Sequence, residues 1–292
     1  MARSPIARFS RALIYRLGPN GTCAEAALES GQPGNSKLPS HRVGQHHQRF
    51  RHHRSRSLPL FLYGTRSMLV RMRKPATVRS TEAFTRARLS ESFFMRDFLY
   101  SEIAAIHGMN NLPDDPDLAI AAGRGLCENL LEPLQRTFGR LAIRSAYRSP
   151  QVNAFGNAHF QSCGSNERNR ARHIWDQRSD DGGMGAMTTV VVPWLVDRLT
   201  RGVTWQAMAW WIHDHLPYSE LQFFPKLAAF NIGWHEIPRR RISSFLPPRG
   251  ILTKPGLPGH DGNHSDQYAG FPKLVSVPRS RFTTESRGTA SI

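Results

Sequence analysis

The sequence predicts an α+β domain at residues 91–241, in which helices and short strands occur along one chain. Apolar residues recur at helical spacing over residues 117–138, after an aspartate and a proline that are suited to start a helix. Residues 141–147 alternate between apolar and polar side chains, which is typical of a strand. A β-branched run at residues 188–194 suits a buried strand. These patterns place helix and strand in the same domain.

Further stretches complete the predicted domain. Residues 93–106 carry apolar side chains at helical spacing, and residues 205–216 form a tryptophan-rich helix that Thr204 can cap. Residues 231–237 are predicted to be the last strand. Residues 153–172 are polar and show little periodicity, which predicts a long loop. Loops of this length inside a compact domain are usually functional.

The basic character of the chain lies in its first third. Residues 1–90 contain 17 Lys and Arg against three acidic residues, so they carry +14 of the net charge of +17. This segment has too little apolar surface to offset the entropy of folding, and we expect it to be disordered. Residues 242–292 are rich in Pro and Gly and are expected to form an irregular tail. Because the composition changes abruptly near residue 90, we also expect that the N-terminus includes an over-extended start, with later methionines available at Met68, Met72 and Met95.

Composition also narrows the class of protein. Three widely spaced cysteines without a CxxC pair argue against a disulfide framework and against a thiolate zinc site. No apolar run is long enough to span a membrane and no signal peptide is evident, so the sequence predicts no localisation. The basic segment lacks a basic helix with interleaved aromatic residues. We therefore expect no specific recognition of nucleic acid.

Three side chains could bind a metal ion, and a fourth could act beside it. A catalytic zinc ion needs about three protein ligands and an open position for water. His173 and Asp180 flank a predicted turn, and His235 comes from the last predicted strand. Bound zinc would activate water and polarise a substrate carbonyl, and Arg148 could stabilise the resulting oxyanion. Spacing alone is weak support, because a histidine and an aspartate seven residues apart also occur by chance.

The segment Ser145–Asn153 adds a resemblance to a known family. It reads S-A-Y-R-S-P-Q-V-N and resembles the S-G/A-Y-R-S-P-x-x-N segment of the M15 zinc peptidases, the D-alanyl-D-alanine carboxypeptidase and phage-endolysin group. The similarity covers about residues 94–238. It implies a small, mostly antiparallel sheet flanked by helices, as in the hedgehog and DD-peptidase fold. It also implies a zinc ion held by His, Asp and His, with Arg148 polarising the scissile carbonyl.

The second motif of that family is altered in this chain. The family pattern is S-x-H-x-x-G-x-A-x-D, and the aligned positions here read Ala171, His173, Asp176, Arg178 and Asp180. The histidine and the aspartate are kept, but the small residues are not. Asp176 therefore competes with Asp180 as the metal ligand, and Asp181 is a weaker competitor. The kept spacing favours Asp180.

The identity of a general base is open at this point. Family members place a glutamate shortly before the last histidine, where this chain has Ile232. The nearby carboxylates are Glu220 and Glu236. Glu236 adjoins His235, but neighbouring side chains on a strand point to opposite faces. We therefore expect Glu220 to be the base, with Glu236 as the alternative.

Two functional hypotheses follow from the resemblance. The first is a zinc-dependent carboxypeptidase or endopeptidase that hydrolyses short peptides of bacterial peptidoglycan with metal-activated water. The second is a catalytically inactive module on the same fold, which binds cell-wall peptide or serves a phage-type structural role. The missing glutamate motivates this alternative.

Overall fold

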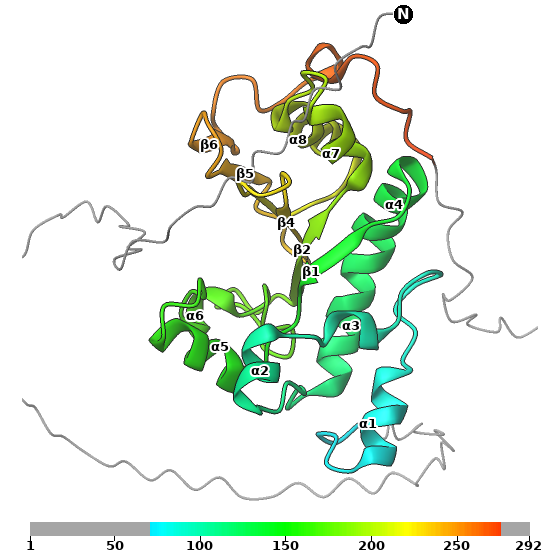
Figure 1. Cartoon of the computed structure of the whole chain (residues 1–292), viewed down its shortest axis with the longest axis vertical. Coiled ribbons are helices and arrows are strands. Elements are labelled where there is room, and N and C mark those ends of the chain that lie inside the picture. The colour runs from blue at the N-terminus through cyan, green and yellow to red at the C-terminus, as the bar shows by residue number, and fades with distance from the viewer. Residues whose placement is uncertain (1–70, 276–292) are drawn as a thin grey trace, which may run out of the picture. The chain divides into compact units, whose positions relative to one another are not determined.

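A computed structural model of the chain describes residues 71–275. The predicted class is confirmed, because these residues form a six-stranded mixed sheet with helices packed against it (Figure 1). Most of the segment expected to be disordered, residues 1–70, and the end of the expected irregular tail, residues 276–292, lie outside the described residues. None of the described helices is both long enough and apolar enough to cross a membrane.

The sheet is almost entirely antiparallel. Its strand order is β1-β2-β4-β3-β5-β6, and the pairing of β3 with β5 is parallel, whereas the other neighbours run antiparallel. The strands are β1 (Ala142–Ser145), β2 (Gly185–Val191), β3 (Glu220–Phe223), β4 (Phe230–His235), β5 (Arg241–Ser244) and β6 (Gly250–Thr253). The central position of β4 brings its C-terminal residues between β2 and β3, where two of the expected site residues meet.

The long helix predicted after Asp115 is confirmed. It is continuous through α3 (Pro116–Leu126), a π-helical turn η2 (Cys127–Leu131) and α4 (Glu132–Phe138). The Asp115 side chain accepts a hydrogen bond from the Leu118 amide at 3.2 Å, as an N-cap should. Gly139, at φ +84°, ends the helix in a conformation that side chains rarely adopt.

Helix α3 packs closely on one face of the sheet. A Cβ atom added to Gly125 would lie 2.4 Å from the Trp234 ring, so only glycine permits this approach. Trp234 shares its face with buried apolar residues, including Ile232 on its own strand and Ala186 opposite it on β2. The opposite face carries Gly233 and His235, because successive residues of a strand alternate between faces. That polar face is where the candidate site lies.

The remaining helices lie around this core. They are α1 (Val78–Thr85), η1 (Met95–Phe98), α2 (Glu102–His107), α5 (Pro150–Ala158), α6 (Asn166–Asn169), α7 (Pro193–Leu199), α8 (Trp205–His215) and η3 (Ser265–Tyr268). The predicted cap of α8 is confirmed, since the Thr204 hydroxyl accepts from the Ala207 amide at 3.4 Å. The single helix expected over residues 93–106 is instead η1 and α2, because Ser101 caps a new helix after the break.

Two predicted irregular segments are wrong in part. The expected loop at residues 153–172 contains the second half of α5 and all of α6, and Ser149 caps α5 with Pro150 at its first position. Residues 242–275, expected to be an irregular tail, contribute most of β5, all of β6 and η3. Trp211 of α8 fixes the end of this segment by donating from Nε1 to the Pro272 carbonyl at 2.9 Å. Helix α1 likewise lies inside the segment that was expected to be disordered.

Candidate functional site

His173 is buried beside the Ser145–Asn153 segment. Its Nδ1 lies 2.8 Å from the Ala146 carbonyl, and its own carbonyl accepts a hydrogen bond from the Arg148 amide at 2.8 Å. Because a carbonyl can only accept, the ring carries its proton on Nδ1 and leaves the Nε2 lone pair free. Burial, followed by the charge of Arg148, holds the pKa of His173 well below its ordinary value. The imidazole is therefore neutral at physiological pH.

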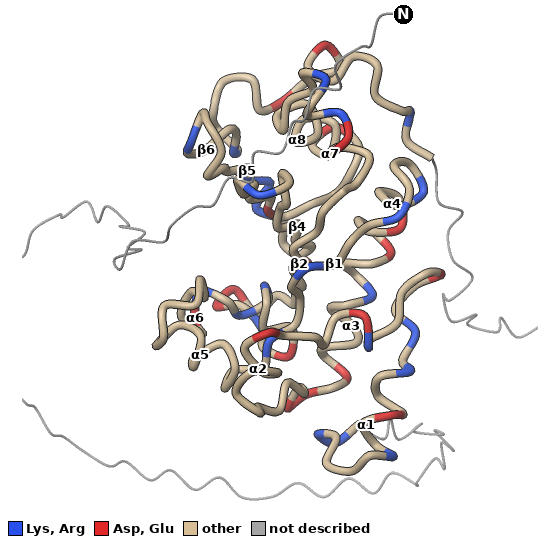
Figure 2. The backbone as a smooth tube through the Cα atoms, in the orientation of Figure 1, with Lys and Arg blue, Asp and Glu red and all other residues tan. Residues whose placement is uncertain are grey.

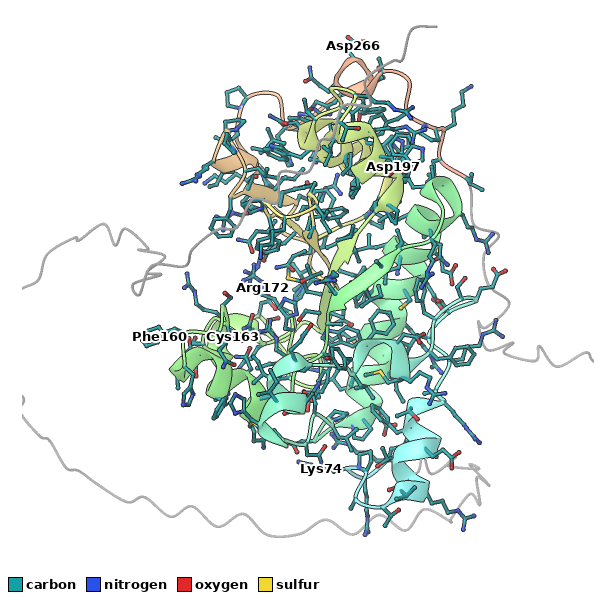
Figure 3. The ribbon with its side chains drawn as sticks, in the orientation of Figure 1. Lys74, Phe160, Cys163, Arg172, Asp197 and Asp266 are labelled. Carbon is teal, nitrogen blue, oxygen red and sulfur yellow. The ribbon has the colours of Figure 1, made fainter. Side chains whose placement is uncertain are left out.

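Arg148 is also buried, with 8% of its surface exposed. A terminal guanidinium nitrogen lies 2.5 Å from the Cys163 sulfur, and its buried Nε makes no hydrogen bond with any described residue. The chain places this arginine next to His173, as the resemblance implies. Its guanidinium is directed at the α5–α6 connection, where Figure 3 labels Cys163.

Asp176 is buried and accepts a hydrogen bond from the Ser145–Asn153 segment. Its carboxylate accepts hydrogen bonds from the Tyr147 hydroxyl at 3.2 Å and from the Asp114 amide at 2.8 Å. Burial raises the pKa of Asp176 above its ordinary value, although these hydrogen bonds act in the opposite direction. The two carboxylate oxygens are thus engaged in joining the loop before α3 to the segment that follows β1.

Two other expected residues lie at the surface. The Asp180 side chain is 86% exposed and forms an ion pair with Arg170 at 3.3 Å. Glu236 is exposed, lies 3.4 Å from Arg178 and accepts from the Met184 amide at 2.7 Å. Asp180 lies in the turn that precedes β2, which bends at Gly182 with φ +79°, whereas Glu236 directly follows β4.

The expected zinc ligands are therefore not assembled as a group. Within residues 71–275, the sole set of three or more potential ligand atoms lying within 4.8 Å of one another comes from His213, Asp214 and His264. The ligand atoms of His173, Asp180 and His235 do not lie within that distance of one another, and Asp176 does not complete such a group with the two histidines, so zinc binding by these residues stays a prediction. The bulkier residues in the altered motif accompany this change: Asp176 turns inward and Asp180 outward.

The His213, Asp214 and His264 group offers no open ligand atoms. His213 contacts the Tyr218 hydroxyl through Nδ1 at 2.7 Å and the His260 carbonyl through Nε2 at 2.8 Å. His264 contacts Asp214 through Nδ1 at 2.6 Å and the Gly259 carbonyl through Nε2 at 2.8 Å. All four ring nitrogens have protein partners, so this cluster fastens the C-terminal segment to α8.

Glu220 and His235 do come together, at a small pocket on the polar face of the sheet. We call it the arginine pocket, and its polar side chains are Arg170, Arg172, Ser179, Ser219, Glu220, His235 and Arg239. Its volume is about 20 Å³. Arg172, labelled in Figure 3, lies near the strands, and Figure 2 shows basic residues beside β4 and β5. The loop that carries Arg172 is held against β2 because its carbonyl accepts from the Met187 amide at 2.8 Å.

Glu220 is buried and is bound by arginines on two sides. Arg172 forms a close ion pair with one of its oxygens, and Arg239 contacts the other at 3.2 Å. Burial, and then the charges of Arg239, Arg241 and Arg168, lower the pKa of Arg172 to about 10. The buried Nε of Arg172 makes no hydrogen bond with the described residues.

His235 is held by Ser179 and by its own strand end. Its Nε2 lies 2.7 Å from the Ser179 hydroxyl, and its Nδ1 lies 2.9 Å from the Ile237 amide. Asp181 accepts a hydrogen bond from the same hydroxyl at 2.5 Å and lies 3.8 Å from Nε2. The hydrogen bonds from the Ser179 hydroxyl and the Gly183 amide lower the pKa of Asp181. Both ring nitrogens of His235 are therefore engaged.

The sequence analysis did not identify Arg172, Arg239 or Ser179 as site residues. A signal was present, since arginines occur at every second position from 168 to 172 and again consecutively at 239–241. Such runs are usually solvated, and the parallel pairing of β3 with β5 that brings the two groups together cannot be seen in the sequence.

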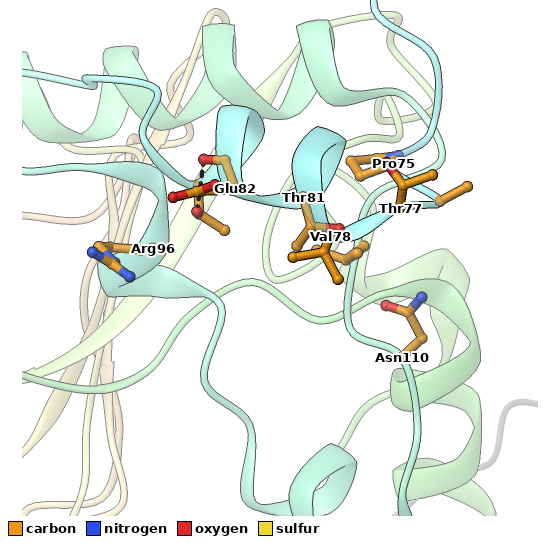
Figure 4. A pocket seen from close by; sticks show the side chains of 10 residues that line it. Pro75, Thr77, Val78, Thr81, Glu82, Arg96 and Asn110 are labelled. Atoms are coloured by element: carbon orange, nitrogen blue, oxygen red, sulfur yellow. Dashed lines mark hydrogen bonds between the residues drawn. The ribbon is translucent and has the colours of Figure 1, made fainter.

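A larger, open depression lies elsewhere, against α1 (Figure 4). Its volume is about 490 Å³, and its lining includes Thr77, Thr81, Glu82, Arg96 and Asn110. None of the expected site residues lines it. We assign it no role in the chemistry discussed below.

Comparison with known proteins adds no further constraint. No family model, no curated protein and no solved structure matches the chain. Function is therefore inferred from the geometry of the site and from the resemblance of Ser145–Asn153.

Proposed function

We propose that residues 71–275 form a peptide-binding module with the fold of the D,D-peptidase family but without its preassembled metal centre. The observation that carries this proposal is the state of Glu220 and His235. Both lie at one pocket, yet arginines bind the glutamate, and Ser179 and the backbone bind the histidine. The ligand we propose is a short cell-wall peptide.

The surroundings of Glu220 suit binding better than proton transfer. A general base for peptide hydrolysis must reach the proton of an activated water. In this pocket, each Glu220 oxygen already accepts from a guanidinium, which stabilises the ionised carboxylate and so weakens it as a base. Two arginines, Arg172 and Arg239, contact this one carboxylate, while Arg170 of the same pocket pairs with Asp180, so the pocket favours an incoming anionic group.

A zinc peptidase is the second candidate, and one observation favours it. His173 is neutral and holds its Nδ1 proton against a backbone carbonyl, which is how histidines that bind metals are commonly oriented. Zinc at Nε2 would supply Lewis-acid chemistry in a peptidase. The carboxylates nearest in sequence do not complete that site, because Asp176 is engaged in the core and Asp180 is exposed.

Muropeptides incubated with the full chain in the presence of zinc separate the two candidates. We expect saturable binding without release of new amino groups. Release of amino groups by the wild type, abolished in His173→Ala, would replace the binding module by a peptidase. Absence of both binding and release would remove both candidates.

A further inference from the structure

We propose that the arginine pocket recognises a carboxylate and that Glu220 is an internal competitor for the ligand. This inference rests on the proposed function, because it names the chemical group of the peptide that the module would bind. It assigns roles to Arg172 and Arg239, which the family resemblance does not implicate.

The sheet forms the floor of the pocket. Met187, Gly233 and Glu220 are opposite one another on β2, β4 and β3, so they form one row across the polar face. Gly233 has no side chain, and a Cβ atom there would lie 2.9 Å from the end of Met187, so the methionine packs directly over the glycine. The pocket lies beside this contact, among Glu220 and the surrounding arginines.

The arginines that contact Glu220 have more donors than this carboxylate can use. Arg172 and Arg239 each form an ion pair with Glu220, Arg170 also lines the pocket and pairs with Asp180, and Arg241 lies opposite Glu220 in the backbone register of β5. Each guanidinium has five N–H donors, whereas Glu220 offers two oxygens. The buried Nε of Arg172 is left without a partner among the described residues, and the Arg239 side chain is 56% exposed. An additional oxyanion would therefore find unused donors, first on Arg239.

The size and geometry of the pocket favour a carboxylate. The unfilled volume of about 20 Å³ is roughly that of one water molecule, so a carboxylate can enter only as Glu220 moves aside, and the rest of the ligand stays outside. Planar guanidinium groups match the two oxygens of a carboxylate in a bidentate arrangement. A free peptide C-terminus is such a head, and the rest of the peptide would lie outside on the polar face.

Glu220 occupies the donors that a ligand would use. Its contact with Arg239 is the more accessible one, because the Arg239 side chain is 56% exposed and that of Arg172 is 33% exposed. An incoming carboxylate therefore pairs first with Arg239 and displaces Glu220 from it, while Glu220 keeps its contact with Arg172. Removing the charge of Glu220 should strengthen binding, whereas removal of a catalytic base would abolish turnover.

Titration of the full chain with N-acetyl-D-alanyl-D-alanine, and separately with its C-terminal amide, tests the inference. We expect the acid to bind at least about tenfold more tightly than the amide, as for the loss of a charge-assisted contact. Glu220→Gln should tighten binding of the acid by roughly threefold or more, and Arg239→Gln should weaken it by about tenfold. Arg201→Gln, an exposed arginine outside the pocket, is the matched control and should bind like the wild type.

Several results would overturn the assignment. Equal binding of acid and amide, or weaker binding of the acid by Glu220→Gln with unchanged thermal unfolding, would contradict a carboxylate site while leaving peptide binding intact. Inorganic phosphate binding more tightly than the acid, with the same dependence on Arg239, would identify a phosphate site instead. If neither peptide form nor the muropeptides bind, the proposed function itself fails. Arg239 is largely exposed, so Arg239→Gln stays informative even if Glu220→Gln unfolds.

Discussion

Asp176 and Glu220 are buried carboxylates that the fold treats differently. Neutral donors, the Tyr147 hydroxyl and the Asp114 amide, surround Asp176, whereas guanidinium groups surround Glu220. The first arrangement joins two segments of the core. The second creates a charged pocket in which a ligand carboxylate could replace Glu220 as the partner of Arg239. Both carboxylates are buried, so their different hydrogen-bond partners explain why Asp176 has a structural role and Glu220 belongs to the candidate site.

The pH dependence of stability should reveal the state of Asp176. Its pKa in the folded chain is raised, so the folded state binds the proton more tightly than the unfolded state does. Above the folded pKa, the ionised Asp176 carboxylate lowers the free energy of unfolding by its full amount. This destabilisation disappears as pH falls to the unfolded pKa of about 3.9. Relative to the wild type, Asp176→Asn should thus gain unfolding free energy as pH rises from 4 to 7. Urea unfolding at several pH values measures this, and a pH-independent difference would contradict it.

At the scale of elements, the contact between α3 and β4 determines which face of the sheet is core. Gly125→Ala would place a methyl group against the Trp234 ring, at 2.4 Å before any relaxation. Because a ring and a helix backbone must both shift, we expect a loss of about 1–3 kcal/mol in the free energy of unfolding. Gly164→Ala is the control, since its nearest neighbour would lie 3.6 Å away. Equal stability of the two variants would show that α3 does not pack in this way.

The C-terminal segment is attached to α8 by an ionic pair. His264 Nδ1 and Asp214 lie 2.6 Å apart, and Tyr268 donates to the same carboxylate at 2.8 Å. Burial opposes ionisation of both groups, but their hydrogen bonds outweigh it. The pKa of His264 is therefore raised and that of Asp214 is lowered. The segment is thus fastened best when both groups are charged.

This pair predicts a pH window for the attachment. The contribution of His264 is complete below its unfolded pKa of about 6.5 and is lost as pH rises through the folded pKa. The contribution of Asp214 is complete above about 3.9 and is lost as pH falls through its own lowered pKa. Hydrogen exchange should show that amides of residues 259–268 lose protection at alkaline pH beyond the intrinsic rate change. Asp214→Asn should remove that dependence, and a persisting dependence would refute the pair's role.

At the scale of the whole molecule, the sequence identified the elements that repeat a regular pattern. The stripe over residues 117–138 and the Thr204 cap each predicted a helix correctly, because period and cap are local properties. Helix α5 was missed, since its Asn and Gly residues resemble a loop, and β6 was missed, since it is short and surrounded by Pro and Gly. The Ser149 cap and Pro150 are a local start signal for α5 that the Asn and Gly residues obscured, whereas β6 depends on its pairing with β5.

The candidate site could be predicted only in part, for a related reason. His235 and Glu220 were identified as site residues, and they share a pocket. The arginines that bind Glu220 are indistinguishable from surface arginines in the sequence. Whether Asp180 faces a ligand or solvent depends on a turn whose path cannot be derived from residue spacing. Pairings between distant strands decide which polar groups meet.

The zinc stoichiometry of the full chain tests the central claim most directly. Mass-spectrometric metal analysis after equilibration with zinc and removal of the excess should show no zinc that depends on His173 or His235. His173→Ala, His235→Ala and His264→Ala should therefore retain the same metal content as the wild type, whatever the N-terminal histidines bind. One zinc ion per chain, lost in both His173→Ala and His235→Ala but kept in His264→Ala, would contradict a module without a metal centre and would favour the peptidase.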